Sequence, residues 1–284
     1  EVFSASPLGM ALLDSAGVVV VGNEALSRFF DRASADVAGH RLSDFRHPDD
    51  TRRESDSHEP AAVDASPDAE RFLRADGSVV YAEVTRTLLR GGRHTVVQLR
   101  DVTVQREAVS RLAYLATHDA ATGVGNRVLL LQELDRAISA EPWERAKIAL
   151  LFIDLDGFKR INDNFSHAVG DQVLRTVAQR LLTVVRPRDW VVRWGGDEFI
   201  VMLHPLAEER VALDLAERIG AALSAPVDVG DDRASVTSSI GVAYSNPGDG
   251  LDIDDLLRNA DTAMYHAKRE QRSSFSVFGS DLAD

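Results

Sequence analysis

The stretch "VVRWGGDEFIVML" (Val191–Leu203) places two glycines and two carboxylates between two apolar runs. Both runs are rich in β-branched and aromatic residues, so each predicts a strand. Gly195 and Gly196 predict a tight hairpin turn between the strands, because glycine reaches positive φ without a steric cost. Asp197 and Glu198 then begin the second strand, where packing alone gives a carboxylate no role. A solvated hairpin tip would also explain these two acids, so their function depends on what the rest of the chain supplies.

The composition limits the classes of protein to which the chain can belong. With 284 residues, it is long enough for two domains of ordinary size. A formal net charge of −13 argues against a general nucleic-acid binder, which would present a basic face. The absence of cysteine excludes disulfides, thiolate catalysis, cysteine metal ligands and a cysteine-based flavin photosensor. Apolar runs such as "GVVVVG" and "IALLFI" have the length of strands, and none approaches the length of a membrane span.

The first third of the chain predicts short strands separated by turns. "GMALLDSAGVVVVGNEALSRFF" predicts two strands and then a helix that begins near Asn23. "RFLRADGSVVYAEVTRTLL" predicts a β-hairpin that turns at Asp76–Gly77, and "HTVVQLRDVT" predicts a further strand. The polar stretch between Asp49 and Glu70 predicts a loop or a polar helix.

These features resemble a PAS sensor domain over residues 1–104, on "LLDSAGVVVVGNEA", "RADGSVVYAEV" and the closing "LRDVT". The resemblance implies an antiparallel sheet with helices flanking a ligand pocket. Its ligand is unknown from the sequence, which leaves an apolar molecule, a flavin, a haem and no ligand open. A haem would need an axial ligand, although each histidine here is more typical of a surface or turn position. These histidines are His40, His47, His58 and His94.

Residues 105–116 predict a charged helical linker between two domains. Val104, Ala108, Leu112 and Leu115 recur at helical spacing and form one apolar stripe. The stripe fits a helix packed against its neighbours, and it fits equally a signalling helix that pairs with its copy in a dimer. It is too short to establish a coiled coil.

From residue 117 onward helices and strands alternate, which predicts an α/β sandwich around a mixed, mostly antiparallel sheet. The expected strands include "KIALLFIDL", "ASVTSSIGVAYS" and "SSFSVF", and "FKRINDNF" predicts a short helix. Pro187 predicts the end of the second long helix. The expected long helices are Arg127–Ser139, Ala168–Arg186, Ala207–Leu223 and Ile253–Glu270.

Asp154 and Asp156 end a buried apolar strand, where a carboxylate has no packing reason to lie. A single Asp at a strand end is most often a cap or a turn residue. Together with Asp197 and Glu198 on a neighbouring hairpin, these residues predict a Mg²⁺ site, because Mg²⁺ prefers a few carboxylates combined with substrate phosphates. Two such ions can stabilise both the attacking and the leaving oxygens of phosphoryl transfer.

"RWGGDEF", with "FIDLDGFKRINDNFSHAVGD" before it and "DTAMYHAKREQR" after it, resembles the GGDEF domain of diguanylate cyclases over residues 117–284. The resemblance implies a fold similar to the palm of polymerases and nucleotidyl cyclases. It also implies the condensation of two GTP into cyclic di-GMP with release of two pyrophosphates. The fold class expected for the whole chain is therefore α+β/α/β, with a PAS fold joined by a helical linker to a palm-like GGDEF domain.

The resemblance also implies roles for individual residues of this chain. Asp197 and Glu198 would be catalytic, with Glu198 assisting at the metal or activating the attacking 3′-hydroxyl. The implied ligands of Mg²⁺ or Mn²⁺ are Asp154, the backbone carbonyl of Leu155, Asp197 and Glu198. The implied substrate-binding residues are Asn162 and Asp171 for guanine, and Lys159, His167, Gly195, Gly196, Lys268 and Arg272. Ordinary surface positions would also explain the basic residues, although Lys268 and Arg272 share one helix face.

"RPRD" (Arg186–Asp189) matches the RxxD inhibitory site of the same family at its expected spacing from the hairpin. An arginine can donate two hydrogen bonds to a phosphate or a guanine edge, and a carboxylate can accept from guanine N–H groups. A simple helix end would explain Arg186, because cations favour the last turn of a helix. That alternative leaves Asp189 unexplained.

Three functions remain open at this point. The first is a PAS-regulated diguanylate cyclase that acts as a homodimer on GTP in the bacterial cytoplasm and is inhibited by its product. The second is a GTP-binding module that regulates an EAL cyclic di-GMP phosphodiesterase domain beyond Asp284, because "SFSVFGSDLAD" resembles the segment that often leads into such a domain. The third is a cyclase that makes another cyclic nucleotide, although Asn162 and Asp171 favour guanine. The start at Glu1 without Met indicates a fragment.

Overall fold

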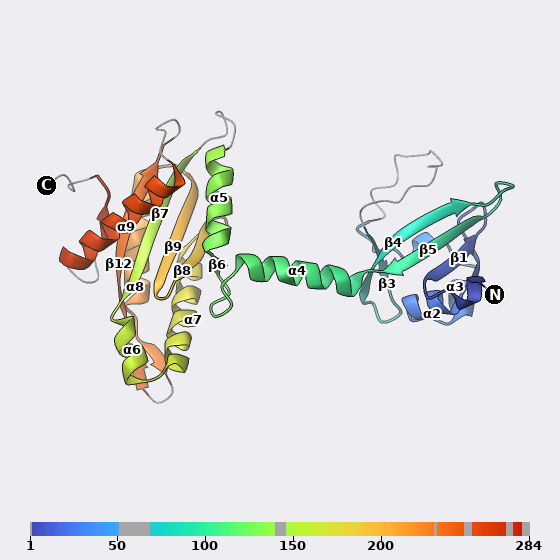
Figure 1. Cartoon of the computed structure of the whole chain (residues 1–284), viewed down its shortest axis with the longest axis horizontal. Coiled ribbons are helices and arrows are strands. Elements are labelled where there is room, and N and C mark those ends of the chain that lie inside the picture. The colour runs from blue at the N-terminus through green and yellow to red at the C-terminus, as the bar shows by residue number, and fades with distance from the viewer. Residues whose placement is uncertain are drawn as a thin grey trace. The chain divides into compact units, whose positions relative to one another are not determined.

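The structure of the chain, a computed structural model, describes residues 2–50, 69–139, 146–229, 232–246, 252–270 and 275–279. It divides into two compact units, Glu1–Leu112 and Ala113–Asp284, each with its own hydrophobic core (Figure 1). Most of the expected polar stretch between Asp49 and Glu70 lies outside the described residues, as do His58 and Arg272.

The N-terminal unit contains a five-stranded antiparallel sheet with the strand order β2-β1-β5-β4-β3. This sheet with flanking helices confirms the architecture expected for this part of the chain. The helices are α1 (Val2–Ala5), α2 (Glu24–Phe30), α3 (Ser34–Val37) and the 3-10 helix η1 (Leu42–Phe45). The strands are β1 (Gly9–Leu13), β2 (Val19–Gly22), β3 (Glu70–Leu73), β4 (Val79–Leu88) and β5 (Thr95–Asp101).

Local sequence signals in this unit behave as expected. Asn23 caps α2, since its Oδ1 accepts from the backbone N–H of Leu26 and also from that of Met10. The β3–β4 hairpin turns at Gly77, whose φ of +83° lies in the region that favours glycine. The core is aromatic, and Phe30 contacts neighbouring rings edge-to-face and tilted. These contacts fill the space between the sheet and α2.

The predicted linker forms a single helix, α4 (Thr103–Thr117). None of its residues is buried by the part of the chain that the structure describes. Val104, Leu112 and Leu115 are 78%, 66% and 49% exposed. The apolar stripe therefore has no covering layer from the described residues of its own chain.

The C-terminal unit contains a six-stranded sheet with the order β13-β12-β7-β9-β8-β6. The three pairs among β12, β7, β9 and β8 are antiparallel, whereas β13 and β6 join the edges in parallel, so the mixed, mostly antiparallel sheet is confirmed. The strands are β6 (Gly125–Asn126), β7 (Lys147–Asp156), β8 (Trp190–Gly195), β9 (Glu198–Leu206), β12 (Thr237–Ser245) and β13 (Phe275–Val277). A separate hairpin is formed by β10 (Val227–Val229) and β11 (Asp232–Ala234).

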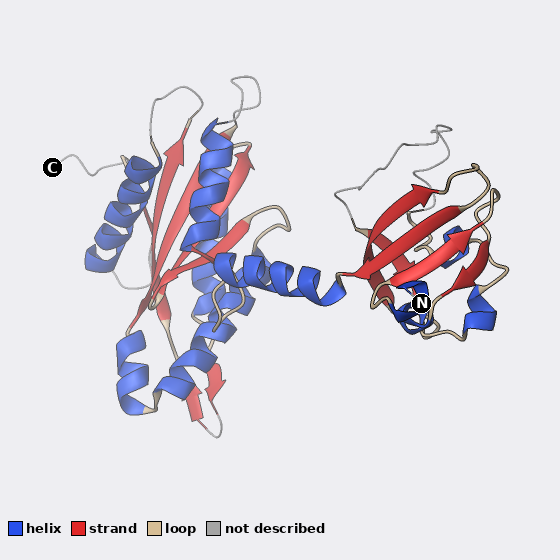
Figure 2. Cartoon of the chain, turned by 45° about the vertical axis from the view of Figure 1, so that its right-hand side comes forward, coloured by secondary structure: helices blue, strands red, loops and turns tan. Residues whose placement is uncertain are grey.

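Helices cover both faces of this sheet (Figures 1 and 2). Helices α7 and α8 pack on one face, and α5 and α9 pack on the other. Strand β7 lies between these layers, which explains why every residue from Ile148 to Asp156 is buried. The helices are α5 (Arg127–Ser139), α6 (Phe158–Asn164), α7 (His167–Val184), α8 (Glu209–Leu223) and α9 (Ile253–Glu270).

Several helix boundaries differ from the sequence prediction, among them the end of α7 and the start of α8. Helix α7 ends at Val184 rather than Arg186, because Val185 is extended and the following residues form a turn. Helix α8 begins at Glu209 rather than Ala207, because β9 continues to Leu206. None of the described helices combines the length and the apolar character needed to cross a bilayer.

Candidate active site

The register of β7 against β9 brings the predicted acids together. Asp154 lies directly opposite Glu198 in the antiparallel pair. The hairpin turn lies one residue later than expected, at Gly196 and Asp197, because Gly195 still pairs with Glu198 as the last residue of β8, and Gly196 adopts a φ of +51°. The backbone N–H of Leu155 donates to the carbonyl of Asp197 at 3.3 Å and ties the hairpin to the end of β7. Two acidic segments far apart in sequence therefore meet at the same end of the paired strands β7 and β9.

Helix α9 contributes a cation to these acids. The Nζ of Lys268 lies 2.7 Å from Oδ1 of Asp154, whose side chain is only 10% exposed. Burial disfavours the charged amine, but the hydrogen bond and the attraction of Asp154 outweigh it and raise the pKa of Lys268. Lys268, expected to contact phosphate, thus forms an ion pair with a candidate metal ligand in this structure.

The pKa values of the two hairpin acids, Asp197 and Glu198, are both raised. Burial is the main cause that raises the pKa of Asp197, and the negative charge of Asp154 adds to it. Burial also raises the pKa of Glu198, with further repulsion from Asp154, Asp197 and Asp261. The charge of Lys268 partly offsets this effect, because it lowers the pKa of both acids.

Asp156 has a different environment from Asp154. Its two carboxylate oxygens accept hydrogen bonds from Oγ1 of Thr237 and Oγ of Ser239, both at 2.9 Å. Asp156 is therefore engaged in joining β7 to β12. This contact favours a positioning role for Asp156 and leaves Asp154 as the acid of β7 that faces the hairpin acids.

The acids suit a divalent cation that completes its coordination with substrate oxygens. Among the described residues, no three acidic or histidine side chains are already gathered around one point. Mg²⁺ typically uses one or two carboxylates, several waters and substrate phosphates, so it needs no complete protein cage. Burial, together with repulsion from Asp154, raises the pKa values of Asp197 and Glu198, and a bound cation would favour their charged forms. The residue set therefore fits Mg²⁺ or Mn²⁺ bound together with phosphate.

The residues expected to recognise guanine lie on two packed helices. Asn162 is on α6, and Asp171 is on the first turns of α7. Gly170 allows the helices to approach, because the side-chain oxygen of Asn162 occupies the space that a Cβ at residue 170 would need. Gly170, which directly precedes Asp171 in the chain, therefore lies against the side chain of Asn162. We did not anticipate the role of Gly170 from the sequence, where a glycine inside the helical run "HAVGD" was the available signal.

The other expected substrate-binding residues are distributed around this region. Lys159 and His167 are exposed on α6 and at the start of α7, and neither forms part of the acidic cluster. Gly195 and Gly196 are exposed in the hairpin. Arg272 lies outside the described residues.

An arginine of the hairpin connects it to the beginning of the domain. Arg193 donates through Nη1 to Oδ1 of Asp119 at 3.1 Å, and through Nη2 to the carbonyl of Gly196 at 2.7 Å. Burial raises the pKa of Asp119, but hydrogen bonds from Thr122 and Arg193 outweigh burial and lower it overall. The pair was missed by the sequence analysis, because 74 residues separate the two positions and neither stands out alone.

Arg186 and Asp189 lie in the turn that follows α7. The backbone N–H of Arg186 donates to Oδ2 of Asp189 at 3.0 Å, and the backbone N–H of Asp189 donates to the carbonyl of Arg186. A simple helix end did not explain Asp189. Its carboxylate stabilises this turn. The guanidinium of Arg186 is exposed beside it.

The described histidines of the N-terminal unit are not gathered in its core. His40 and His94 are exposed, and His47 is half-buried beside Asp49, with Nδ1 at 3.6 Å from the carboxylate.

Comparison with known proteins matches both units to families. The profile "Diguanylate cyclase, GGDEF domain" matches residues 116–274, and the profile "PAS fold" matches residues 1–102. The bifunctional diguanylate cyclase/cyclic di-GMP phosphodiesterase MucR of Pseudomonas aeruginosa is 40% identical over 171 residues, which cover 60% of this chain and 25% of MucR. Diguanylate cyclase TpbB of the same species is 44% identical over 165 residues, which cover 57% of this chain and 38% of TpbB.

Solved structures agree with these matches. The isolated GGDEF domain of Pseudomonas aeruginosa TpbB has 41% sequence identity and a TM-score of 0.54, covering 57% of this chain and 94% of that chain. The coiled coil and GGDEF domain of DgcB from Caulobacter crescentus, in complex with c-di-GMP, has 30% identity and a TM-score of 0.57, covering 62% of this chain and 93% of that chain. This chain spans about a quarter to two fifths of the length of the curated relatives named above. It belongs to the GGDEF diguanylate cyclase family and carries a PAS domain before its GGDEF domain.

Proposed function

We propose that the chain is a diguanylate cyclase that condenses two GTP into cyclic di-GMP and two pyrophosphates. The observation that carries this proposal is the pairing of Asp154 with Glu198 across β7 and β9, beside Asp197 and Lys268. A GTP-binding module without turnover would not need this complete acidic set. The GGDEF family match and the naming of TpbB as a diguanylate cyclase support the same activity.

The acidic residues would have different roles in the reaction. Asp154, the backbone carbonyl of Leu155 and Asp197 would hold Mg²⁺ or Mn²⁺, together with Glu198. When bound, the cation would neutralise charge on the phosphates and polarise the reacting oxygens. Glu198, at the start of β9, would assist at the metal or accept the proton of the attacking 3′-hydroxyl.

Lys268 would exchange partners when substrate binds. In this structure its ammonium is paired with Asp154. A cation at the acids would compete for the same carboxylate oxygen and leave Lys268 free to contact the triphosphate. Lys159, His167, Arg272 and the backbone N–H groups of Gly195 and Gly196 would contribute further phosphate contacts. The acidic chain would thereby concentrate its few substrate-facing cations where the anionic substrate lies.

Asn162 and Asp171 would recognise guanine. A carboxylate accepts from N1–H and N2–H₂ together, and an amide pairs with the remaining edge of the base. Adenine presents a different pattern at these positions, which would favour GTP over ATP. The contact between Asn162 and Gly170 sets the amide beside α7, next to Asp171.

Turnover requires two chains in this proposal. Each GGDEF domain would bind one GTP, and each 3′-hydroxyl must attack the α-phosphate held by the partner. The exposed stripe of α4 is the surface that would pair the chains, and the PAS domain before it would change that pairing in response to a signal that the sequence leaves unknown. We divide the chain accordingly into a PAS domain (1–104), a signalling helix (105–116) and a cyclase domain (117–284).

Arg186 and Asp189 would form an inhibitory site for cyclic di-GMP. The exposed guanidinium can donate to a phosphate or to a guanine edge, and Asp189 can accept from guanine N–H groups while its other oxygen holds the turn. Product bound there would hold the two active sites apart. Because GTP is its substrate, we place the cyclase domain in the bacterial cytoplasm.

The second candidate function is a GTP-binding regulator of a cyclic di-GMP phosphodiesterase domain. The match to MucR, which is named as both a diguanylate cyclase and a cyclic di-GMP phosphodiesterase and of which this chain covers 25%, supports only the phosphodiesterase part of this alternative. Incubation of the purified chain with GTP and Mg²⁺, followed by chromatographic identification of the product, separates the two candidates. Cyclic di-GMP formation supports the cyclase, whereas GTP binding without product supports the regulator.

A further inference from the structure

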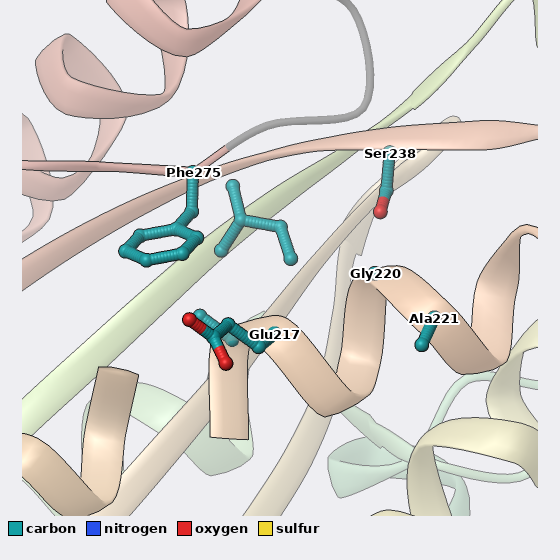
Figure 3. A pocket seen from close by; sticks show the side chains of 7 residues that line it. Glu217, Gly220, Ala221, Ser238 and Phe275 are labelled. Carbon is teal, nitrogen blue, oxygen red and sulfur yellow. The ribbon is translucent and has the colours of Figure 1, made fainter. Parts of the chain in front are cut away.

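A pocket lies on the side of the sheet opposite the acidic cluster. It has a volume of about 340 Å³ and is formed between α8, β12 and β13 (Figure 3). Side chains alternate along β12, so Ser239 faces Asp156, whereas Ser238 and Ile240 face α8. The lining residues are Ala216, Glu217, Gly220, Ala221, Ser238, Ile240 and Phe275.

Ser238 supplies an unused hydrogen-bonding group in this pocket. The residue is 2% exposed, and its Oγ has no hydrogen-bond partner within the described ranges. Figure 3 shows the hydroxyl pointing from β12 toward α8 near Gly220. A buried hydroxyl without a partner is costly, since it has given up its bonds to water. An occupant of the pocket that hydrogen-bonds to Ser238 would remove this cost.

The rest of the pocket is mainly apolar. Ile240, which is 1% exposed, lines the pocket together with Phe275. The ring of Phe275 lies at the opposite end from Ser238 (Figure 3). Gly220 keeps the helix side open, because a Cβ at this position would meet no atom within 4 Å. The volume lies within the range of about 300–1,000 Å³ typical of small-molecule sites. The pocket can therefore hold a body of the size of a single aromatic ring.

Charge narrows the class of ligand further. Glu217 is the charged residue among those that line the pocket, and it is exposed at the helix side. Because none of the described residues that line the pocket is basic, an anionic ligand would face Glu217 without a cation from these positions. The site is therefore chemically unlike the nucleotide site, where Lys268 and the acids handle phosphate and metal.

We propose that this pocket binds a small aromatic molecule that carries an uncharged or cationic hydrogen-bonding group and no acid. The ring packs on Ile240 and Phe275, and the polar group contacts Ser238 or reaches Glu217. Binding here involves no residue of the candidate active site. Its failure is therefore distinguishable from failure of the proposed cyclase activity.

The experiment titrates the whole 284-residue chain with benzamide, benzamidine and benzoate, without nucleotide or metal. Isoleucine methyl groups are isotopically labelled and followed by NMR, and Ile240→Val assigns the signal of Ile240. We expect benzamide and benzamidine to shift the Ile240 signal in a saturable manner. We expect benzoate to bind at least about tenfold more weakly than benzamidine, since Glu217 repels it.

Two variants at Gly220 form the matched comparison. Gly220→Leu fills the pocket, whereas Gly220→Ala raises helix propensity in the same way and leaves most of the space open. Binding should be lost in Gly220→Leu and retained in Gly220→Ala. Ser238→Ala should weaken the binding of benzamide by about three- to tenfold, the range of one net hydrogen bond. If Gly220→Leu does not fold, as judged by circular dichroism, Ala221→Phe takes its place.

Three results would overturn the proposal. The first is that none of the three probes shifts the Ile240 signal, which would indicate a pocket filled by water alone. The second is an unchanged titration in the folded variant that fills the pocket. The third is binding of benzoate as tight as that of benzamidine, which would contradict the assigned ligand chemistry.

Discussion

The guanidinium of Arg193 bridges the carboxylate of Asp119 and the carbonyl of Gly196, and so links the turn after α4 to the hairpin of the candidate active site. The two ionic side chains are 15% and 24% exposed, so the pair is shielded from water. The hairpin turn would otherwise depend on Gly196, which imposes little rigidity on the backbone. The position of Asp197 and Glu198 therefore depends on a contact formed outside the acidic cluster.

Replacing Asp119 tests this link. We expect Asp119→Asn to lower the free energy of unfolding by about 1–3 kcal/mol, because the hydrogen bonds to Arg193 and Thr122 lose their charge. Turnover should fall by about tenfold or more, since small displacements of reacting groups are costly. Asp135→Asn, an exposed change on α5, serves as the control. Urea denaturation and steady-state kinetics measure both effects, and wild-type turnover in Asp119→Asn would contradict the link.

The ion pair between Asp119 and Arg193 should make the free energy of unfolding depend on pH. The folded-state pKa of Asp119 lies below its ordinary value, so its stabilising contribution is complete above that ordinary value. The contribution is lost as the pH falls through the lowered pKa. The difference in unfolding free energy between wild type and Asp119→Asn should therefore be constant near neutral pH and shrink under strongly acidic conditions.

Removing a hairpin acid should separate stability from activity. Asp197→Asn deletes a buried charge that repels Asp154 and Glu198, so the melting temperature should stay unchanged or rise by a few degrees. Turnover should disappear, because a metal ligand is lost. Asp154→Ala should also abolish turnover, and Glu198→Ala should lower it strongly with a smaller loss of GTP binding. Calorimetry and product analysis measure these effects, and wild-type rates in folded Asp197→Asn would show that the site is misplaced.

Gly170→Ala tests the guanine site without touching a proposed contact to the base. The new Cβ would collide with the side-chain oxygen of Asn162 and displace it. We expect KM for GTP to rise by about tenfold, the cost of about one hydrogen bond to the base. Gly220→Ala is the matched control, because it is also a helical glycine but faces open space. Equal KM values for GTP in the two variants would show that Asn162 does not take part in guanine recognition.

Substitutions in the exposed apolar stripe of α4 test whether this helix mediates dimerisation. Leu112→Glu together with Leu115→Glu should abolish self-association and reduce turnover per chain by at least about tenfold, because charges would replace the apolar contact. Ser110→Glu, on the opposite face of the helix, should change neither property. Analytical ultracentrifugation and kinetics at several protein concentrations measure the outcome. Constant specific activity in a monomeric concentration range would contradict the requirement for a dimer.

Product inhibition is tested at Arg186. Arg186→Ala should relieve inhibition by added cyclic di-GMP by about tenfold or more, because the exposed guanidinium is the phosphate donor of the proposed site. Asp189→Ala would also disturb the turn, since its carboxylate accepts from the backbone of Arg186. The arginine variant is therefore the cleaner test. Inhibition should be non-competitive with GTP, and an unchanged inhibition curve in Arg186→Ala would exclude control from this site.

Local patterns in the sequence were sufficient to predict the order of most elements. Helix α5 (Arg127–Ser139) and helix α9 (Ile253–Glu270) have the predicted bounds, because apolar spacing and polar flanks specify such helices locally. The sequence correctly predicted a hairpin here, and its turn depends on the positive φ of Gly196, whereas Gly195 remains in β8. Boundaries were less accurate at the end of α7, where a side-chain contact from Asp189 shapes the turn.

The sequence by itself determined the acidic motif, the glycine turn and the order of the domains, since each depends on neighbouring residues. Only the tertiary structure decided that Lys268 pairs with Asp154, that Asp156 is engaged by Thr237 and Ser239, and that Arg193 reaches Asp119. These contacts join positions 74 to 114 residues apart, and strand register together with helix packing brings them together. A local pattern carries no information about such register, because it arises from the packing of the whole core.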